Sequence, residues 1–212
     1  MMGTLRSYEN SVFINCPFDA EYRPIFEALV FAVFDCGFVP RCAYEFAGSG
    51  GPRIENLVTL VRECKYGIHD ISRTELSKKS KLPRFNMPLE LGMFLGAMKL
   101  GTADQKKKEC LILDLTPYRY QKFISDIAGQ DIQPHNRSFR TAIRRVRDWL
   151  NAASDPSIVK PGGTVMVRRY DKYLLDLPAQ CAAVHLKPDE LTFTDIVFLV
   201  SGWLQENPVS VS

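Results

Sequence analysis

The residues of this chain that could do chemistry gather just after short apolar segments. Asn15, Cys16 and Phe18 follow the first segment, Arg41 and Cys42 the second, His69, Asp70 and Ser72 the third, and Asp114 the fourth. If the apolar segments are parallel strands, these residues meet in the crevice at the carboxyl ends of the strands, where open α/β sheets bind ligands. The pattern therefore predicts a small-molecule site at one edge of a sheet.

Glu90 is the strongest catalytic candidate. It is surrounded by apolar residues in the segment 87–98, which reads as a helix that is hydrophobic nearly all round. A carboxylate in an apolar interior is costly unless it is paired, so its pKa rises toward a catalytically useful range. The alternative is structural. If Pro88 is the first helical residue, Glu90 occupies the third position and stabilises the helix N-terminus.

The elements that would position these groups alternate along the chain. Apolar runs at 11–16, 38–42, 65–71 and 110–115 predict strands, and periodic segments at 22–36, 54–61, 87–98, 120–127 and 139–151 predict helices. This alternation implies βαβ units and a parallel sheet with helices on both faces. A linker at 152–163 precedes two more predicted helices, at 165–177 and 194–205. We therefore expect an α/β domain over 1–153 and a helical extension over 154–212.

Composition narrows the class of protein. The 212 residues carry 27 basic and 24 acidic side chains, a net charge of +3, which is too small for a dedicated nucleic-acid surface. The six cysteines form neither a Cys-x-x-Cys pair nor a zinc spacing with histidine, so we expect free thiols and no metal site. The longest apolar run is too short for a membrane span, and we expect a cytoplasmic protein that does not bind membranes.

A longer pattern is found around Asp70 and Glu90. A strand ending Gly67-Ile68-His69-Asp70-Ile71-Ser72 precedes the sequence Asn86-Met87-Pro88-Leu89-Glu90-Leu91-Gly92. This resembles the TIR-like and nucleoside 2-deoxyribosyltransferase-like group, in which a strand ending in Asp-Leu-Ser/Thr is followed by Asn-Pro-Asn-Val-x-Tyr-Glu-Leu-Gly. The similarity covers about residues 11–115. It implies a flavodoxin-like three-layer α/β/α fold and cleavage or exchange of N-glycosidic bonds in NAD or nucleosides. Several TIR-like members act in bacterial defence.

The resemblance also implies roles for individual residues. Glu90 would attack or stabilise the anomeric carbon, and Asp70 and Ser72 would line the ribose and phosphate pocket. Asn86 matches the loop asparagine beside the ligand, and the segment from Val12 to Phe18 matches the opening strand and loop that contact the base. The site residues expected from position and resemblance together are Glu90 and Asp70 as catalytic groups, with Asn15, Cys16, Phe18, Arg41, His69, Ser72 and Asn86 binding the ligand. Pro88 and Leu89 depart from the Val-x-Tyr stretch.

Other features allow two interpretations each. Arg41 could bind a phosphate or pair with Glu45. Cys16 and His69 could form a nucleophile–base pair or meet by accident. The glycine-rich stretch 47–53 could cradle a phosphate or be a simple loop. Lys78, Lys79, Lys81 and Arg84 could steer an anion or be a solvated face. His135 and His185 are interpreted as surface residues.

Two functions from different classes follow. The first is an enzyme that cleaves an N-glycosidic bond in NAD or a related nucleotide or nucleoside, which would be its substrate, with no cofactor. The second is a catalytically silent nucleotide-binding sensor or scaffold. The resemblance and the apolar helix surfaces also predict a homo-oligomer.

Overall fold

A five-stranded sheet forms the centre of the computed structural model, which describes residues 7–48, 50–74 and 84–209. The strands are β1 (Ser11–Asn15), β2 (Val39–Arg41), β3 (Tyr66–Asp70), β4 (Glu109–Asp114) and β5 (Ile132–Pro134). Their order is β2-β1-β3-β4-β5 and every pairing is parallel. This is the strand order of flavodoxin-like sheets, so the predicted α/β fold class is confirmed.

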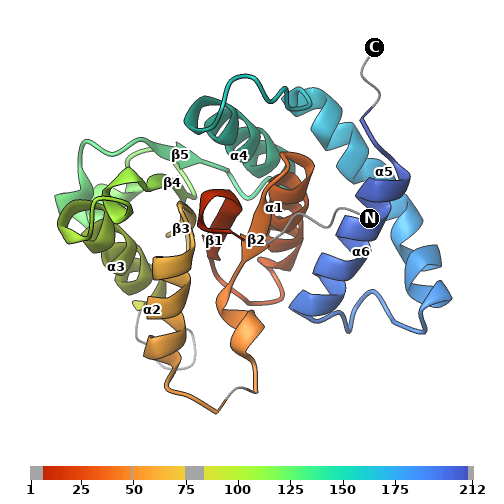
Figure 1. Cartoon of the computed structure of the whole chain (residues 1–212), viewed down its shortest axis with the longest axis horizontal. Coiled ribbons are helices and arrows are strands. Elements are labelled where there is room, and N and C mark those ends of the chain that lie inside the picture. The colour runs from red at the N-terminus through yellow and green to blue at the C-terminus, as the bar shows by residue number, and fades with distance from the viewer. Residues whose placement is uncertain (1–6, 49, 75–83, 210–212) are drawn as a thin grey trace.

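Helices cover both faces of the sheet. They are α1 (Arg23–Asp35), α2 (Arg53–Glu63), α3 (Asn86–Leu100), α4 (Phe139–Ala153), α5 (Gly163–Ala183) and α6 (Phe193–Glu206). Figure 1 shows α2 and α3 on one side of the sheet, α1 and α4 on the other, and α5 and α6 outside α1. The result is a three-layer α/β/α arrangement with two more helices packed on one outer face.

The strand pleat divides the core between the two faces. In β1, Val12 and Ile14 belong to the hydrophobic cluster around α1 and α4, whereas Phe13 belongs to the cluster around α2 and α3. Successive side chains of a strand point to opposite faces, and both faces here are covered. This explains why the strands read as continuous apolar runs, and it decides on which face each strand-end polar group lies.

The nearly uniform hydrophobicity of α1 has the same kind of cause. Residues Ala28 to Val33 are all fully buried, because the sheet covers one side of the helix and α4, α5 and α6 cover the other. Phe31 lies with its ring centroid 5.1 Å from Tyr170 of α5 and 5.8 Å from Trp203 of α6. The C-terminal helices therefore share one hydrophobic cluster with α1. The division into domains at 153/154 remains a prediction.

Two local predictions were wrong. The segment 120–127 is not one helix but two short 3-10 helices, η4 (Arg119–Lys122) and η5 (Ser125–Ile127), and Tyr118 ahead of them has a left-handed backbone with φ of 59°. Strand β5 was missed because its three residues carry no apolar run and end in Pro134. Proline is tolerated there because β5 is an edge strand.

None of the helices in the described ranges combines the length and the apolarity that crossing a bilayer requires.

Candidate functional site

The strands that follow β1 and β3 in the chain lie on opposite sides of this pair: β2 is next to β1, and β4 is next to β3. Strands β1 and β3 are neighbours, yet β1 leads into α1 on one face of the sheet and β3 precedes α3 on the other. Connections that diverge in this way leave a crevice at the carboxyl ends of the two strands, where flavodoxin-like folds bind ligands. Asn15 and Asp70 end these strands, so the predicted site has the position that the topology favours.

Asn15 joins the two strand ends to α3. Its side-chain Nδ2 lies 3.0 Å from Nδ1 of His69 and donates to the backbone oxygen of Met87 at 2.9 Å. Both donors of the amide are thereby used inside the protein. Asn15 is 1% exposed, and we interpret it as a residue that fixes the start of α3 above the crevice.

His69 lies in the core rather than in the crevice. It is fully buried between the rings of Phe13 and Phe94, with centroid distances of 5.5 and 4.8 Å. Burial lowers its pKa to about 3, helped by the positive charge of Lys108, so the ring is neutral. Its Nδ1 accepts from Asn15, which leaves the proton on Nε2. His69 therefore supports Asn15 and has no free lone pair to act as a base.

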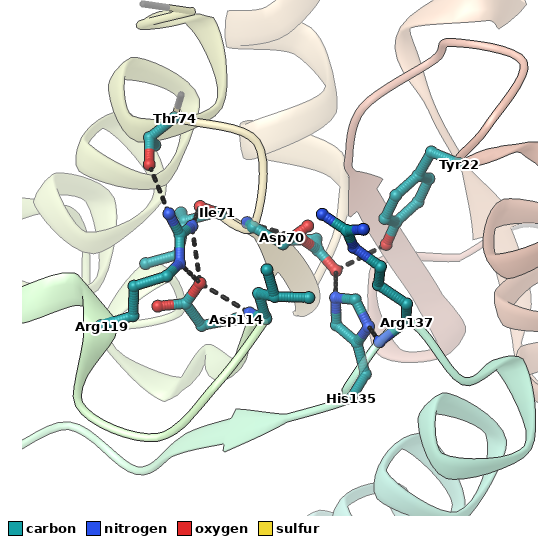
Figure 2. Close-up of polar contacts among 10 residues, drawn as sticks. Tyr22, Asp70, Ile71, Thr74, Asp114, Arg119, His135 and Arg137 are labelled. Carbon is teal, nitrogen blue, oxygen red and sulfur yellow. Dashed lines mark hydrogen bonds and ion pairs between the residues drawn. The ribbon is translucent and has the colours of Figure 1, made fainter. Parts of the chain in front are cut away.

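Asp70 is the centre of a buried polar cluster on the α1 face (Figure 2). Its Oδ2 accepts a hydrogen bond of 2.6 Å from the hydroxyl of Tyr22, and its Oδ1 accepts one of 2.8 Å from the backbone N–H of Ser72. Nε2 of His135 lies 3.1 Å from Oδ2. Asp70 is completely buried, and its partners come from the segments that follow β1, β3 and β5. This carboxylate holds the strand ends in place.

The prediction that His135 is a surface residue was wrong, whereas His185 is exposed as predicted. His135 is only 1% exposed, and its Nδ1 accepts from the backbone N–H of Arg137 at 3.1 Å. With Nδ1 an acceptor, Nε2 carries the proton that faces Asp70. The residue directly follows β5, so recognising that short edge strand would have placed His135 at a strand end. Tyr22 gave no comparable signal.

Asp114 anchors a second polar cluster, also drawn in Figure 2. Arg119 donates to Oδ1 of Asp114 at 2.8 Å, to the backbone oxygen of Ile71 at 2.8 Å and to the hydroxyl of Thr74 at 3.1 Å. The guanidinium thus ties the end of β4 to the chain leaving β3. Burial raises the pKa of Asp114, while the backbone N–H of Leu115 and Arg119 oppose that shift.

Glu90 differs from both aspartates because it has few partners. It is 3% exposed, and Arg53 at the start of α2 places Nη2 3.6 Å from its Oε1. Burial raises the pKa of Glu90 from 4.5 to about 7, although Arg53 opposes the shift. Arg53 itself is well exposed, with 62% of its side chain accessible, so this partner can move away without breaking the core.

The alternative interpretation of Glu90 as a helix cap was wrong. Helix α3 begins at Asn86, two residues before Pro88, so Glu90 is its fifth residue and lies beyond the first turn. No side chain caps the helix start. The carboxyl group is therefore not explained by helix stabilisation, and its burial beside an exposed arginine is the feature that calls for a function.

Cys16 is buried next to both acids. Burial raises the pKa of its thiol well above 9, and the charges of Asp70 and Glu90 add to the shift. The thiol is therefore protonated at neutral pH and is a weak nucleophile. Because Nδ1 of His69 also accepts from Asn15 and its Nε2 carries the proton, the Cys16–His69 pair is left without support.

Arg41 is not brought to the crevice. Its guanidinium pairs with Glu45 at 2.7 Å and with Glu63 at 3.3 Å, which favours the structural alternative. With Ser7, Tyr8 and other residues it lines a cavity of about 540 Å³. Ser7 and Tyr8 precede β1, so they lie at the end of the sheet where β1 begins, opposite the carboxyl ends of the strands that carry Asn15 and Asp70.

The remaining predicted site residues lie around the crevice. Phe18 lines a cavity of about 640 Å³ between the loop after β1, the segment after β2 and the start of α6. Ser72 lines a smaller cavity of about 140 Å³ with Tyr22 and His135. Asn86 is exposed at the start of α3. Lys78, Lys79 and Lys81 lie outside the described residues, whereas Arg84 pairs with Asp19 at 3.4 Å.

Glu90 does not line the large cavity, but Arg53 links the two. Burial raises the pKa of Tyr44 in the cavity wall, and Arg53 is close enough to oppose this shift while also contacting Glu90. The described residues contain no group of three or more histidine, cysteine or acidic side chains arranged to hold a metal ion.

Comparisons with protein-family models, with curated proteins and with solved structures found no match to this chain.

Proposed function

We propose that this protein cleaves an N-glycosidic bond in NAD or a related nucleotide or nucleoside, with Glu90 as the catalytic carboxylate. The observation that carries the proposal is the environment of Glu90. It is a buried acid near the crevice between β1 and β3, with a pKa raised to about 7, and its ion-pair partner among the described residues is the exposed Arg53. Strongly perturbed acids beside a cleft are candidates for catalysis.

The chemistry needs one carboxylate and no external redox partner. The bond between the anomeric carbon and the base breaks, and its electron pair stays with the base. The carbon becomes oxocarbenium-like, and Glu90 stabilises it by charge or captures it covalently. Water then adds its oxygen to this carbon. Where a covalent bond to Glu90 has formed, that bond breaks and its electron pair returns to the carboxylate, and the proton of the water passes to the carboxylate or the departing base. Nicotinamide is a good leaving group because its ring carries a positive charge before cleavage.

The other expected residues take supporting parts in this proposal. Asp70 is a positioning residue, because both of its oxygens already accept hydrogen bonds from Tyr22 and Ser72. Asn15 positions the first turn of α3, which directly precedes Glu90. Arg53 pairs with Glu90 in the free protein and is placed to meet a phosphate when a ligand displaces it.

Base release tests the proposal. The purified protein is incubated at high concentration with NAD and with a panel of nucleosides, and free base is measured by chromatography. Glu90→Gln keeps the shape but removes the charge, and Glu206→Gln, an exposed glutamate at the end of α6, is the matched control. We expect release by the parent and by the control, and loss of at least a hundredfold in Glu90→Gln. The rate of the parent should rise with pH around 7.

One observation favours a second function, a nucleotide-binding sensor without turnover. Because Asp70 is saturated by internal partners, Glu90 is the one predicted catalytic acid that remains available. A thermal shift on addition of NAD or a nucleoside, with no base released by any variant, would support the sensor and contradict the enzyme.

A further inference from the structure

The cavity of about 640 Å³ is built from three segments that are far apart in the sequence. They are the loop after β1 together with the start of α1, the segment that follows β2, and the residues that open α6. Its volume lies within the range of small-molecule sites, which is ~300–1,000 Å³. We call it the aromatic pocket, because four rings contribute to its wall: Phe18, Phe26, Tyr44 and Phe193.

The rings form a continuous surface. The centroid of Phe18 lies 4.3 Å from that of Tyr44 and 5.3 Å from that of Phe26, and Phe26 lies 6.0 Å from Phe193. Phe26 and Phe193 are buried, whereas Tyr44 is 46% exposed and can receive a flat ring against its accessible face. Such surfaces bind planar ligands, since stacking on an aromatic side chain tolerates any ring with a π-face.

The wall that α6 supplies is held in place by α1. Arg23 donates to the backbone oxygens of Pro188, Asp189 and Leu191 at 3.2, 3.1 and 3.3 Å. Its Nε–H group donates to Glu27 at 2.7 Å. Thr192 caps α6 by accepting from the backbone N–H of Asp195. The start of α6 is thus fixed against the start of α1.

The charged residues of the pocket wall are paired with partners in the protein. Asp19 contacts Arg73 at 2.9 Å and Arg84 at 3.4 Å, and Glu45 pairs with Arg41 at 2.7 Å. The guanidinium of Arg23 is bonded to Glu27 and to the backbone oxygens before α6. The wall therefore has no strong attraction for an anion, and its rings favour a heteroaromatic group of one or two rings.

We propose that the aromatic pocket binds a heteroaromatic ring and that the start of α6 forms one wall of this ring site. The C-terminal helices then take part directly in ligand recognition. This inference deepens the proposed function and rests on it for one point, that the ring is the base of the substrate whose sugar reaches Glu90. Ring binding itself is measured without turnover.

Binding of nicotinamide and of adenine by ligand-observed NMR or calorimetry tests the inference. Thr194→Trp fills the pocket from an exposed position in the wall, and Gln205→Trp adds the same bulk to α6 outside the pocket. We expect Thr194→Trp to weaken binding of at least one ring by tenfold or more, and Gln205→Trp to leave it unchanged. Tyr44→Ala should weaken binding roughly five- to hundredfold, and Tyr118→Ala, a remote exposed tyrosine, should not.

The outcomes separate this inference from the proposed function. Failure of the parent to bind either ring, or equal binding by Thr194→Trp and Gln205→Trp, overturns the ring site even when base release is observed. Ring binding that Thr194→Trp abolishes, in a parent that releases no base, supports the ring site and contradicts the enzyme. Glu90→Gln should retain ring binding in either case.

Discussion

Removing the charge of Glu90 should change how the stability of the protein depends on pH. In the folded protein the pKa of Glu90 is raised to about 7 from 4.5, and burial is the main cause. Between these two values the folded state binds more protons than the unfolded state, so stability falls as pH rises through this window. Glutamine cannot ionise. The parent should therefore lose stability relative to Glu90→Gln as pH rises toward 8.

The magnitude follows from the two pKa values. Each pH unit of difference corresponds to ~1.4 kcal/mol, which gives a destabilisation of at most about 3 kcal/mol once the carboxyl group is fully ionised. Between pH 5 and pH 8 the expected change in the difference between parent and variant is about 2.5 kcal/mol. Relaxation of the site and water penetration around the ionised carboxylate lower this value, so a change of about 1–2.5 kcal/mol is the expected range.

Urea unfolding at pH 5, 6, 7 and 8 measures this difference. Parent, Glu90→Gln and the exposed control Glu206→Gln are followed by two probes to establish a two-state transition. The control should run parallel to the parent at every pH. If Glu90→Gln also runs parallel to the parent within about 0.5 kcal/mol, the carboxyl group ionises as it would in water and the reasoning about its burial is wrong.

Three further predictions concern its partners and the framework. Arg53→Ala removes the charge that opposes the rise in the pKa of Glu90, so this pKa should rise further. In the same urea series, the loss of stability of Arg53→Ala should therefore extend to higher pH than that of the parent, and an unchanged profile would contradict the pairing. Tyr22→Phe deletes the 2.6 Å hydrogen bond to the buried Asp70 and should lower the free energy of unfolding by about 1–3 kcal/mol, whereas Tyr118→Phe should change it little. Arg169→Met should cost about 3–5 kcal/mol, because it leaves the buried Asp35 of α1 without its bidentate partner from α5. Adding Asp35→Asn to Arg169→Met should recover part of this loss, and a transition of α5 separate from the rest of the chain would show that the two helices do not unfold together.

Much of the fold was predictable because local patterns and burial agree. The four apolar runs are strands β1 to β4, since a strand covered on both faces needs apolar residues at successive positions. Pro24 and Gly37 bracket α1, and the left-handed backbone of Gly37 (φ 85°) ends the helix where a side chain would be strained. The edge strand β5 was not predictable in this way, because one neighbour and partial exposure impose no apolar run.

The candidate site was predictable in position but not in the roles of its members. Asn15 and Asp70 end β1 and β3, yet the pleat sends Asp70 to the α1 face while α3 carries Glu90 on the other. Asn15, His69 and Arg41 found partners inside the protein. Arg41 pairs with Glu45, four residues along the chain, whereas His69 lies 54 positions from Asn15 and Tyr22 lies 48 positions from Asp70, and no local pattern specifies such distant pairs.

By itself, the sequence determined the class of fold, the edge at which polar groups gather and the choice of Glu90, because strand alternation and the cost of burying a carboxylate are local properties. Only the tertiary structure decided that Asp70 is saturated, that Arg53 faces Glu90 and that α6 closes an aromatic pocket. These depend on how helices pack across the sheet. Packing brings together side chains that the sequence keeps far apart.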